Sequence, residues 1–117
     1  MKILILGAGR VGSSLAEMLV NDKSDVTVVD THTEALDKLQ ERFDLRTVAG
    51  TATSIEVLRD AGIDDVDMIV AVTADDEVNL VACKIAHKVF NVPQRIARTR
   101  STQWLHNSDL LSEDGFA

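Results

Sequence analysis

Segments with a strand-like apolar pattern alternate with helix-like segments along the chain. Continuous apolar or β-branched runs predict five strands, the first of them buried on both faces. These strands span residues 2–7, 25–30, 45–50, 67–73 and 94–100. Apolar residues at helical spacing, together with glycine and proline boundaries, predict five helices. These helices span residues 11–21, 33–43, 54–62, 75–90 and 101–111. No internal repeat, linker or low-complexity segment interrupts the order.

A glycine-rich loop joins the first strand to the first helix. Its residues are Gly7, Ala8, Gly9, Arg10, Val11 and Gly12, which form a G-x-G-x-x-G pattern. In such a loop the first glycine allows a tight turn, the second lets a diphosphate approach the backbone, and the third lets helix and strand pack closely. The free N–H groups of the helix then face the phosphates. The loop therefore predicts a nucleotide site.

This loop, and the alternation of strands with helices, predict an α/β fold of the Rossmann type. We expect one domain over residues 1–117, with a doubly wound parallel sheet in three layers, α/β/α. The expected strand order is 3-2-1-4-5, with the reversal beside the first strand. Ligands bind such sheets at that reversal, between the carboxyl ends of the first and fourth strands. The candidate site residues should therefore gather there.

Asp30 and Arg10 define the kind of nucleotide that the loop could take. Asp30 ends the second strand 18 residues after Gly12, where its carboxylate can accept hydrogen bonds from both ribose hydroxyls. It would repel a 2′-phosphate, so NADP is disfavoured. The alternative is an ordinary strand-to-helix turn without a ligand, in which Asp30 caps the next helix. Arg10 can cover the phosphates or remain solvated at the helix start. NAD or NADH, and ATP or ADP, all remain open as ligands.

The far side of the crevice offers a second group of candidate contacts. Thr73 and Ala74 follow the fourth strand, and we predict that both contact the ligand. Thr73 with Asp76 also fits a helix capping box. A divalent metal on Asp75 or Asp76 is expected only if a triphosphate brings it, so no metal site is predicted. Arg98, near the end of the fifth strand, is a phosphate candidate, and its alternative is a sheet-end arginine in water.

The composition of the chain argues against nucleic acids and membranes as direct partners. The net charge of −7 argues against nucleic-acid binding, which needs clustered lysines and arginines. No apolar run reaches the roughly 18 residues of a membrane span, and no leader precedes Ile3. We therefore expect a soluble, cytoplasmic protein without membrane insertion. The single cysteine, Cys83, excludes an internal disulfide and is interpreted as a packing residue.

Helix 75–90 carries more apolar surface than packing on one sheet requires. Its apolar residues cover roughly 200° of the helix wheel. They are Val78, Val81, Ala82, Cys83, Ile85, Ala86, Val89 and Phe90. The excess predicts a partner surface, most simply a homodimer. The alternative is that the last helix and Trp104 cover it.

Catalytic groups are missing from the sequence pattern. The chain has no tyrosine, so it lacks the Tyr-x-x-x-Lys pair of short-chain dehydrogenases. His32, His87 and His106 are interpreted as surface histidines, and no nucleophile pairs with a base. These observations favour a site that binds without chemistry. The alternative is the cofactor-binding half of an NAD-dependent dehydrogenase, whose catalytic domain would lie elsewhere.

Four stretches carry a resemblance to a known family. They read MKILILGAGRVGSSLAEMLV, VTVVD, LRDAGIDDVDMIVAVTADDEVNLVAC and RIARTR. Together they resemble the N-terminal RCK/KTN (TrkA-N) domains of Trk potassium-uptake regulators. The glycine loop is general to Rossmann domains, whereas residues 58–83 and the ARTR ending are specific to this family.

The resemblance implies a regulatory domain and not an enzyme. Such domains bind NAD(H) or ATP and ADP, form homodimers that assemble into a ring, and gate a membrane potassium transporter from its cytoplasmic face. By similarity the contacts would be loop 7–11, Asp30, the pair Thr73 and Ala74, and Arg98. Arg10 resembles the Ktr-type regulators, in which it would favour a triphosphate. The family domain continues into a sixth strand and a crossover helix, so we expect that this chain stops before them.

Overall fold

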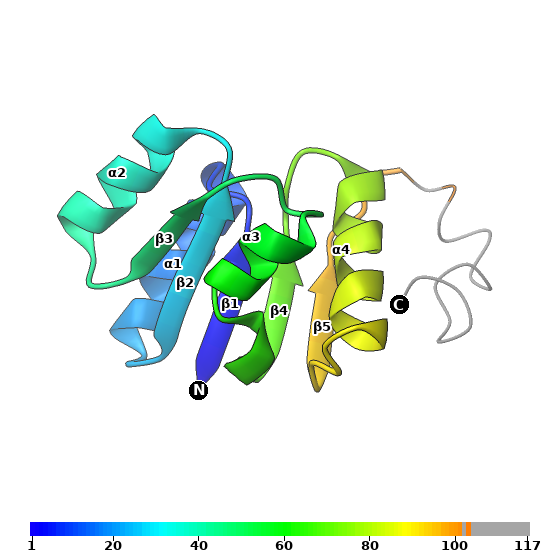
Figure 1. Cartoon of the computed structure of the whole chain (residues 1–117). Coiled ribbons are helices and arrows are strands. Elements are labelled where there is room, and N and C mark those ends of the chain that lie inside the picture. Colours follow the sequence, from blue (N-terminus) through cyan, green and yellow to red (C-terminus); the bar gives the residue numbers. More distant parts are fainter. Residues whose placement is uncertain (102, 104–117) are drawn as a thin grey trace.

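The computed structural model describes residues 1–101 and residue 103, which form one parallel sheet with helices on both faces (Figure 1). Its strands are β1 (Lys2–Leu6), β2 (Asp25–Asp30), β3 (Arg46–Ala49), β4 (Met68–Ala71) and β5 (Gln94–Ala97). Its helices are α1 (Arg10–Asn21), α2 (Thr33–Arg42), α3 (Ile55–Asp60) and α4 (Asp76–Lys88), with a 3₁₀ turn at Ile63–Asp65. The predicted helix 101–111 lies almost entirely outside the described residues.

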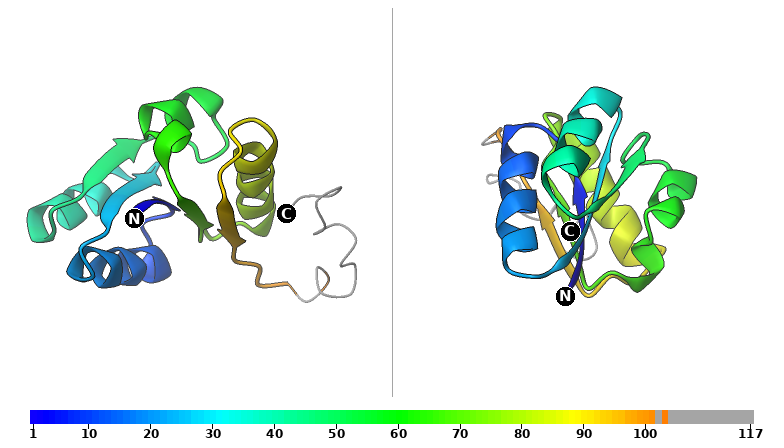
Figure 2. Two further views of the ribbon diagram at one scale, coloured as in Figure 1. Left: turned by 90° about the horizontal axis from the view of Figure 1, so that it is seen from below. Right: turned by 90° about the vertical axis from the view of Figure 1, so that its left-hand side faces the viewer.

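The sheet has the predicted order β3-β2-β1-β4-β5, so the doubly wound fold is confirmed. Helices α1 and α2 cover one face, and α3 and α4 cover the other (Figure 2). The central strand β1 supplies both halves of the core, because Ile3 and Ile5 face α1 whereas Leu4 and Leu6 face α3 and α4. A strand buried on both faces explains the unbroken apolar run that predicts it.

Most differences from the predicted boundaries lie at the ends of elements, where the chain leaves the regular ladder. The outer strands β3 and β5 are shorter than predicted, and β4 ends at Ala71. The predicted helix 54–62 is corrected to α3 followed by a 3₁₀ turn. Gly62 adopts a left-handed φ of 84° between them, a conformation that ends an α-helix and suits glycine. Ser54 begins α3 by accepting a hydrogen bond from the Val57 N–H at 3.3 Å.

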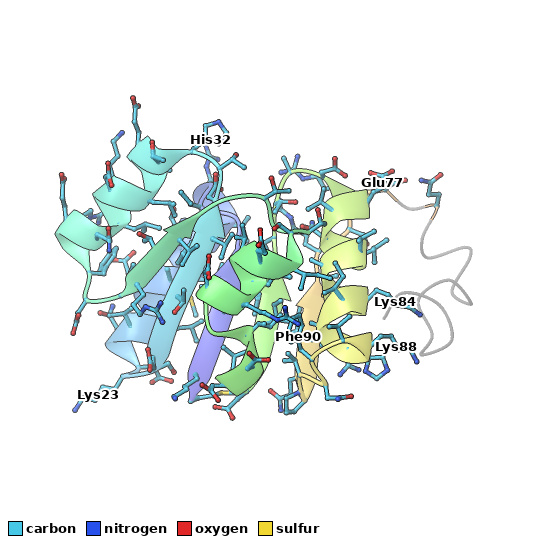
Figure 3. All side chains as sticks on the ribbon, viewed as in Figure 1. Lys23, His32, Glu77, Lys84, Lys88 and Phe90 are labelled. Carbon is cyan, nitrogen blue, oxygen red and sulfur yellow. The ribbon has the colours of Figure 1, made fainter. Side chains whose placement is uncertain are left out.

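Strand register brings the carboxyl ends of four strands to one edge of the sheet. Leu6 pairs with Val29 on one side and with Ala71 on the other, and Ala71 pairs with Ala97. The loops after β1, β2, β4 and β5 therefore meet. His32, which follows β2, and Glu77, in the first turn of α4, lie at this same end (Figure 3). Among the described residues, no helix is both long and apolar enough to span a bilayer.

Candidate functional site

A cavity of about 470 Å³ lies at the carboxyl ends of the strands. All the predicted site residues except Gly12 line it. They are Gly7, Ala8, Gly9, Arg10, Val11, Asp30, Thr73, Ala74 and Arg98. The cavity has two sides. The near wall consists of residues 7–11 and Asp30, with Gly12 packed behind them, and the far wall consists of Thr73, Ala74, Asp75 and Arg98, with Asn79 buried behind them.

The three glycines of the loop occupy three different structural environments. Gly7 has a φ of 113°, which L side chains rarely adopt, and it lies against the backbone of Val72 and Thr73. Gly12 packs so closely that a Cβ there would lie 1.8 Å from the carbonyl oxygen of Gly7. Gly9 has open space where a Cβ would stand, with no atom within 4 Å. Gly9 is therefore the glycine over which a ligand can approach the backbone, and Gly12 acts in packing alone.

Asp30 ties the end of β2 to the glycine loop. Its Oδ2 accepts a hydrogen bond from the Ala8 N–H at 2.7 Å, and its Oδ1 accepts one from the His32 N–H at 2.7 Å. The His32 ring Nδ1 lies 3.1 Å from the same Oδ1. Partial burial raises the pKa of this carboxyl, but the hydrogen bonds from Ala8 and His32 outweigh it, so the pKa lies below its ordinary value. Asp30 is thus held as a carboxylate that still faces the cavity.

Helix α1 presents its N-terminus to the cavity without a side-chain cap. The N-cap is Gly9, which has no side chain to accept from the first turn, and that turn contains no acid. Arg10, the first helical residue, is exposed and lines the cavity. A cation at this position opposes the helix dipole. The uncapped N–H groups and Arg10 together make this end of the near wall suited to an anion.

The far wall is organised by hydrogen bonds to Asn79. This buried side chain accepts from the Thr73 N–H at 2.9 Å and from the Thr73 hydroxyl at 2.6 Å through Oδ1. Its Nδ2 donates to the carbonyl oxygens of Thr73, at 3.1 Å, and of Arg98, at 2.9 Å. The Thr73 hydroxyl is therefore engaged within the wall, although Thr73 lines the cavity.

Arg98 follows β5 and reaches the residues that follow β4, as the predicted strand order places it. Its Nη2 donates to the carbonyl oxygens of Val72, at 3.2 Å, and of Thr73, at 2.9 Å. Its Nε is buried and has no hydrogen-bond partner among the described residues. The side chain is half-buried and lines the cavity, so it is not the water-exposed arginine of the alternative interpretation.

The predicted capping box of Thr73 with Asp76 is wrong. The N-cap of α4 is Asp75, whose Oδ1 accepts from the N–H groups of Glu77, at 3.0 Å, and Val78, at 3.2 Å. The Thr73 hydroxyl lies two residues before this cap, where it donates to Asn79 Oδ1 and accepts from the Asp75 N–H at 3.3 Å. Asp76 instead accepts from the backbone N–H groups of Arg100 and Ser101, both at 2.9 Å.

Several residues that line the cavity, and Asn79 behind its far wall, were not predicted from the sequence. Asn79 carried a usable signal, since it stands three, four and seven residues before the buried Ala82, Cys83 and Ala86 of α4. A polar residue on a buried helix face must find hydrogen-bond partners. The unpredicted lining residues carried no signal of their own. They include Thr31, His32, Ala35, Gly50, Thr51, Ala52, Val78 and Arg100.

Two of the three histidines lie within the described residues. His32 is exposed over 83% of its side chain, and His87 is half-buried on α4. His106 lies outside the described residues. Cys83 is buried, as predicted, and its burial raises the pKa of the thiol to about 11. Within the described part of the chain, no three His, Cys, Asp or Glu side chains are grouped to hold a metal ion.

Comparisons with known proteins agree with the resemblance in the sequence. The profile of the TrkA-N domain matches residues 3–115. The chain is 53% identical over 111 residues to the Trk system potassium uptake protein TrkA of Haemophilus influenzae, covering 95% of this chain and 24% of that protein. It is 50% identical over 114 residues to the TrkA of Halomonas elongata, covering 97% of this chain and 25% of that protein. This chain thus spans about a quarter of the length of these relatives.

Solved structures share the fold at low sequence identity. The AMP-bound C-terminal domain of Kef from Shewanella denitrificans superimposes with a TM-score of 0.80 at 19% identity, over all of this chain and 70% of that one. The NAD(P)-binding domain of an exopolyphosphatase-related protein from Archaeoglobus fulgidus gives a TM-score of 0.77 at 21% identity, over 92% and 79%. These similarities support the Rossmann-type architecture.

Proposed function

The chain belongs to the TrkA-N domain family, and we propose that it is the nucleotide-binding regulatory domain of a potassium uptake system. The observation that carries this proposal is the near wall. There, a helix N-terminus without a side-chain cap, an open approach over Gly9 and an ionised Asp30 line one cavity. The names of the relatives, Trk system potassium uptake proteins, supply the system.

The near wall suits the ribose and phosphate groups of an adenine nucleotide. The Asp30 carboxylate accepts ribose hydroxyls, and the phosphates lie over Gly9 against the N-terminus of α1. Asp30 also disfavours a 2′-phosphate, because two negative groups would meet. Loop 7–11, Asp30, Thr73, Ala74 and Arg98 are the proposed contacts, with Gly12 supporting the turn. AMP in the Kef domain, which shares the fold, supports the adenosine assignment.

Two ligand classes fit this arrangement, and they differ in where the cations act. NAD or NADH would place its diphosphate near Arg10, whereas ATP or ADP would extend its terminal phosphate toward Arg10 or Arg98. Both arginines line the cavity. The domain is proposed to act as a sensor and not as an enzyme, and the names of the relatives, which refer to potassium uptake, support this proposal.

Exposed apolar side chains of α4 support the proposed homodimer. Val81 of α4 and Val89, its C-cap, are exposed by 36% and 48%. Exposed large apolar side chains are typical of protein interfaces when they form a patch. In the whole protein we propose that such dimers form a ring on the cytoplasmic side of a membrane potassium transporter subunit. Sedimentation at several concentrations tests the dimer, which a single monomeric species at high micromolar concentration would contradict.

Calorimetric titration with NAD, NADH, ATP and ADP, under one set of conditions, tests the function. We expect that either NAD and NADH or ATP and ADP bind with micromolar or tighter affinity. Tighter NADH than NAD would indicate a redox sensor, and tighter ATP than ADP an energy sensor. Asp30→Ala should weaken binding by about 1–3 kcal/mol, the usual cost of losing a charged hydrogen-bond partner. Asp37→Ala, an exposed acid of α2 that does not line the cavity, is the control. If no nucleotide binds to the unaltered chain, the proposed function is wrong.

A further inference from the structure

Asn79 is a buried amide that does not line the cavity but contacts two residues that do. It has 0% exposure in α4. Its Oδ1 accepts two hydrogen bonds from Thr73, and its Nδ2 donates one to the Thr73 carbonyl and one to the Arg98 carbonyl. An amide side chain has two acceptor lone pairs and two donor hydrogens, so its capacity is filled. Such a saturated buried group resists displacement, because each lost bond would leave a polar atom unpaired.

The bonds of Asn79 and Arg98 meet at one atom. The Thr73 carbonyl oxygen accepts from Asn79 Nδ2 at 3.1 Å and from Arg98 Nη2 at 2.9 Å. Asn79 also holds the backbone carbonyl of Arg98. The two ends of Arg98, its carbonyl and its guanidinium, are therefore joined through Asn79 and Thr73. This closed set of hydrogen bonds keeps the guanidinium at the cavity, with a buried Nε that still lacks a partner.

The same turn of α4 holds the chain as it leaves β5. Asp76 accepts from the N–H of Arg100 through Oδ1 and from the N–H of Ser101 through Oδ2, both at 2.9 Å. Asn79 holds the carbonyl of Arg98 two residues earlier. Residues 98–101, called the exit segment here, are thus fixed by two side chains of one helix. Figure 1 shows this segment leaving the upper end of β5 beside the start of α4.

We propose that Asn79 is a positioning residue that holds Arg98 for a phosphate group and links that phosphate to the exit segment. This inference rests on the proposed nucleotide site. A phosphate that draws the Arg98 guanidinium toward the cavity takes Nη2 from the Thr73 and Val72 carbonyls. Loss of the Nη2 bond to the Thr73 carbonyl alters a hydrogen-bond set in which Asn79 holds both that carbonyl and the Arg98 carbonyl, so the change is carried into the exit segment and the first turn of α4. Nucleotide occupancy would thereby reach the chain that follows β5.

A double-mutant cycle tests whether Asn79 acts through Arg98. Affinity for adenosine and for whichever of ATP or NAD binds more tightly is measured in Asn79→Ala, Arg98→Ala and the double variant. We expect Asn79→Ala to weaken nucleotide binding about tenfold and adenosine binding little. The double variant should bind no more weakly than Arg98→Ala alone. Leu80→Ala, buried beside Asn79 in the chain and absent from the cavity lining, is the control. It should lower stability without changing the ratio of nucleotide to adenosine affinity.

Additive losses, or equal losses for adenosine and nucleotide, would overturn the positioning role. Failure of ATP and NAD to bind the unaltered chain would instead overturn the proposed function itself.

A measurement on the unaltered chain avoids dependence on the folding of the variants. In nuclear magnetic resonance titrations, the Asn79 side-chain amide and the backbone amides of Arg100 and Ser101 should shift with nucleotide and not with adenosine. Asp64 in the 3₁₀ turn, far from the cavity lining, supplies a reference amide that should not respond. If the three reporting signals stay unchanged at saturating nucleotide, the link to the exit segment is wrong.

Discussion

The two walls of the cavity face the same ligand space but are built by different means. The near wall is shaped by the backbone. Gly7 has a positive φ, Gly12 has no Cβ atom, and the Ala8 N–H donates a hydrogen bond to Asp30. The far wall is shaped by side chains, through Asn79 and Arg98, which bond to carbonyl groups of other segments. The near wall requires glycines, which have no Cβ atom, whereas the far wall requires side chains that form hydrogen bonds with other segments. Substitutions in the two walls should therefore fail in different ways.

The largest effect is expected from Gly12→Ala. Its Cβ would lie 1.8 Å from the Gly7 carbonyl oxygen, and helix α1 would have to move away from the loop. We expect a loss of about 3 kcal/mol in the free energy of unfolding, measured by denaturant titration. Gly9→Ala is the matched control, because it meets no atom within 4 Å and has a φ of −76°. It should cost under about 1 kcal/mol in stability and chiefly weaken nucleotide binding. Equal destabilisation by both variants would contradict the backbone account of the near wall.

Arg98→Ala tests the far wall. We expect a loss of about 1.5–3 kcal/mol in the binding of phosphate-rich nucleotides, the range for hydrogen bonds to charged groups, and a smaller loss for adenosine. Arg95→Ala, three residues earlier on β5, is a close control. Arg95 is also half-buried, also donates to a backbone carbonyl and also has an unpartnered buried Nε, but it does not line the cavity. Equal losses for adenosine and ATP in Arg98→Ala would remove Arg98 from the phosphate site.

Asp30→Asn tests the contribution of charge to the near wall. The folded-state pKa of Asp30 lies below its ordinary value, mainly because Ala8 and His32 donate to it against the effect of burial. Its stabilising contribution is therefore complete above about pH 4 and is lost as the pH falls through the lowered pKa. At pH 7 we expect Asp30→Asn to unfold more easily by about 1–2 kcal/mol.

The difference between Asp30→Asn and the unaltered chain should shrink in unfolding measurements made at successively lower pH below about 4. A difference that stays constant over this range would show that the carboxylate charge does not stabilise the loop.

The smallest effect is expected from His32→Ala. The ring contacts Asp30 at 3.1 Å, but 83% of the side chain is exposed, and surface ion pairs contribute about 0–1 kcal/mol. Thermal unfolding should show a change within that range, because the His32 backbone N–H still donates to Asp30. A larger loss would show that the His32 side chain, and not only backbone, holds the near wall.

The near wall was predictable because its backbone geometry requires particular residue types at particular positions. A turn with positive φ and a close helix contact require glycine, so the spacing of Gly7, Gly9 and Gly12 reports the backbone path. The continuous apolar runs likewise predicted buried strands, and the glycine loop predicted the observed strand order. Asp30 could be placed from its distance along the chain, because one helix and one strand separate it from the loop.

The far wall was only partly predictable, because it depends on contacts between distant segments. Arg98 was identified as a phosphate candidate, but its bonds to the Val72 and Thr73 carbonyls could not be read from a strand-end arginine. The predicted capping box is wrong because α4 begins after Asp75, which is its N-cap, and not after Thr73. Threonine and aspartate both cap helices, so the local pattern did not decide which of the two residues the helix would follow.

The type of fold, the glycine loop and the family follow from the sequence, since all three depend on residue types at fixed spacings. How the far wall is held, and which turn of α4 fixes the exit segment, depend on contacts that form in the folded chain. Parallel strands require crossovers, so neighbours in the sheet, such as β1 and β4, are far apart in the chain. Hydrogen bonds across such neighbours form wherever buried polar groups must be paired, and that pairing is chosen by the packing of the sheet and not by the order of residues.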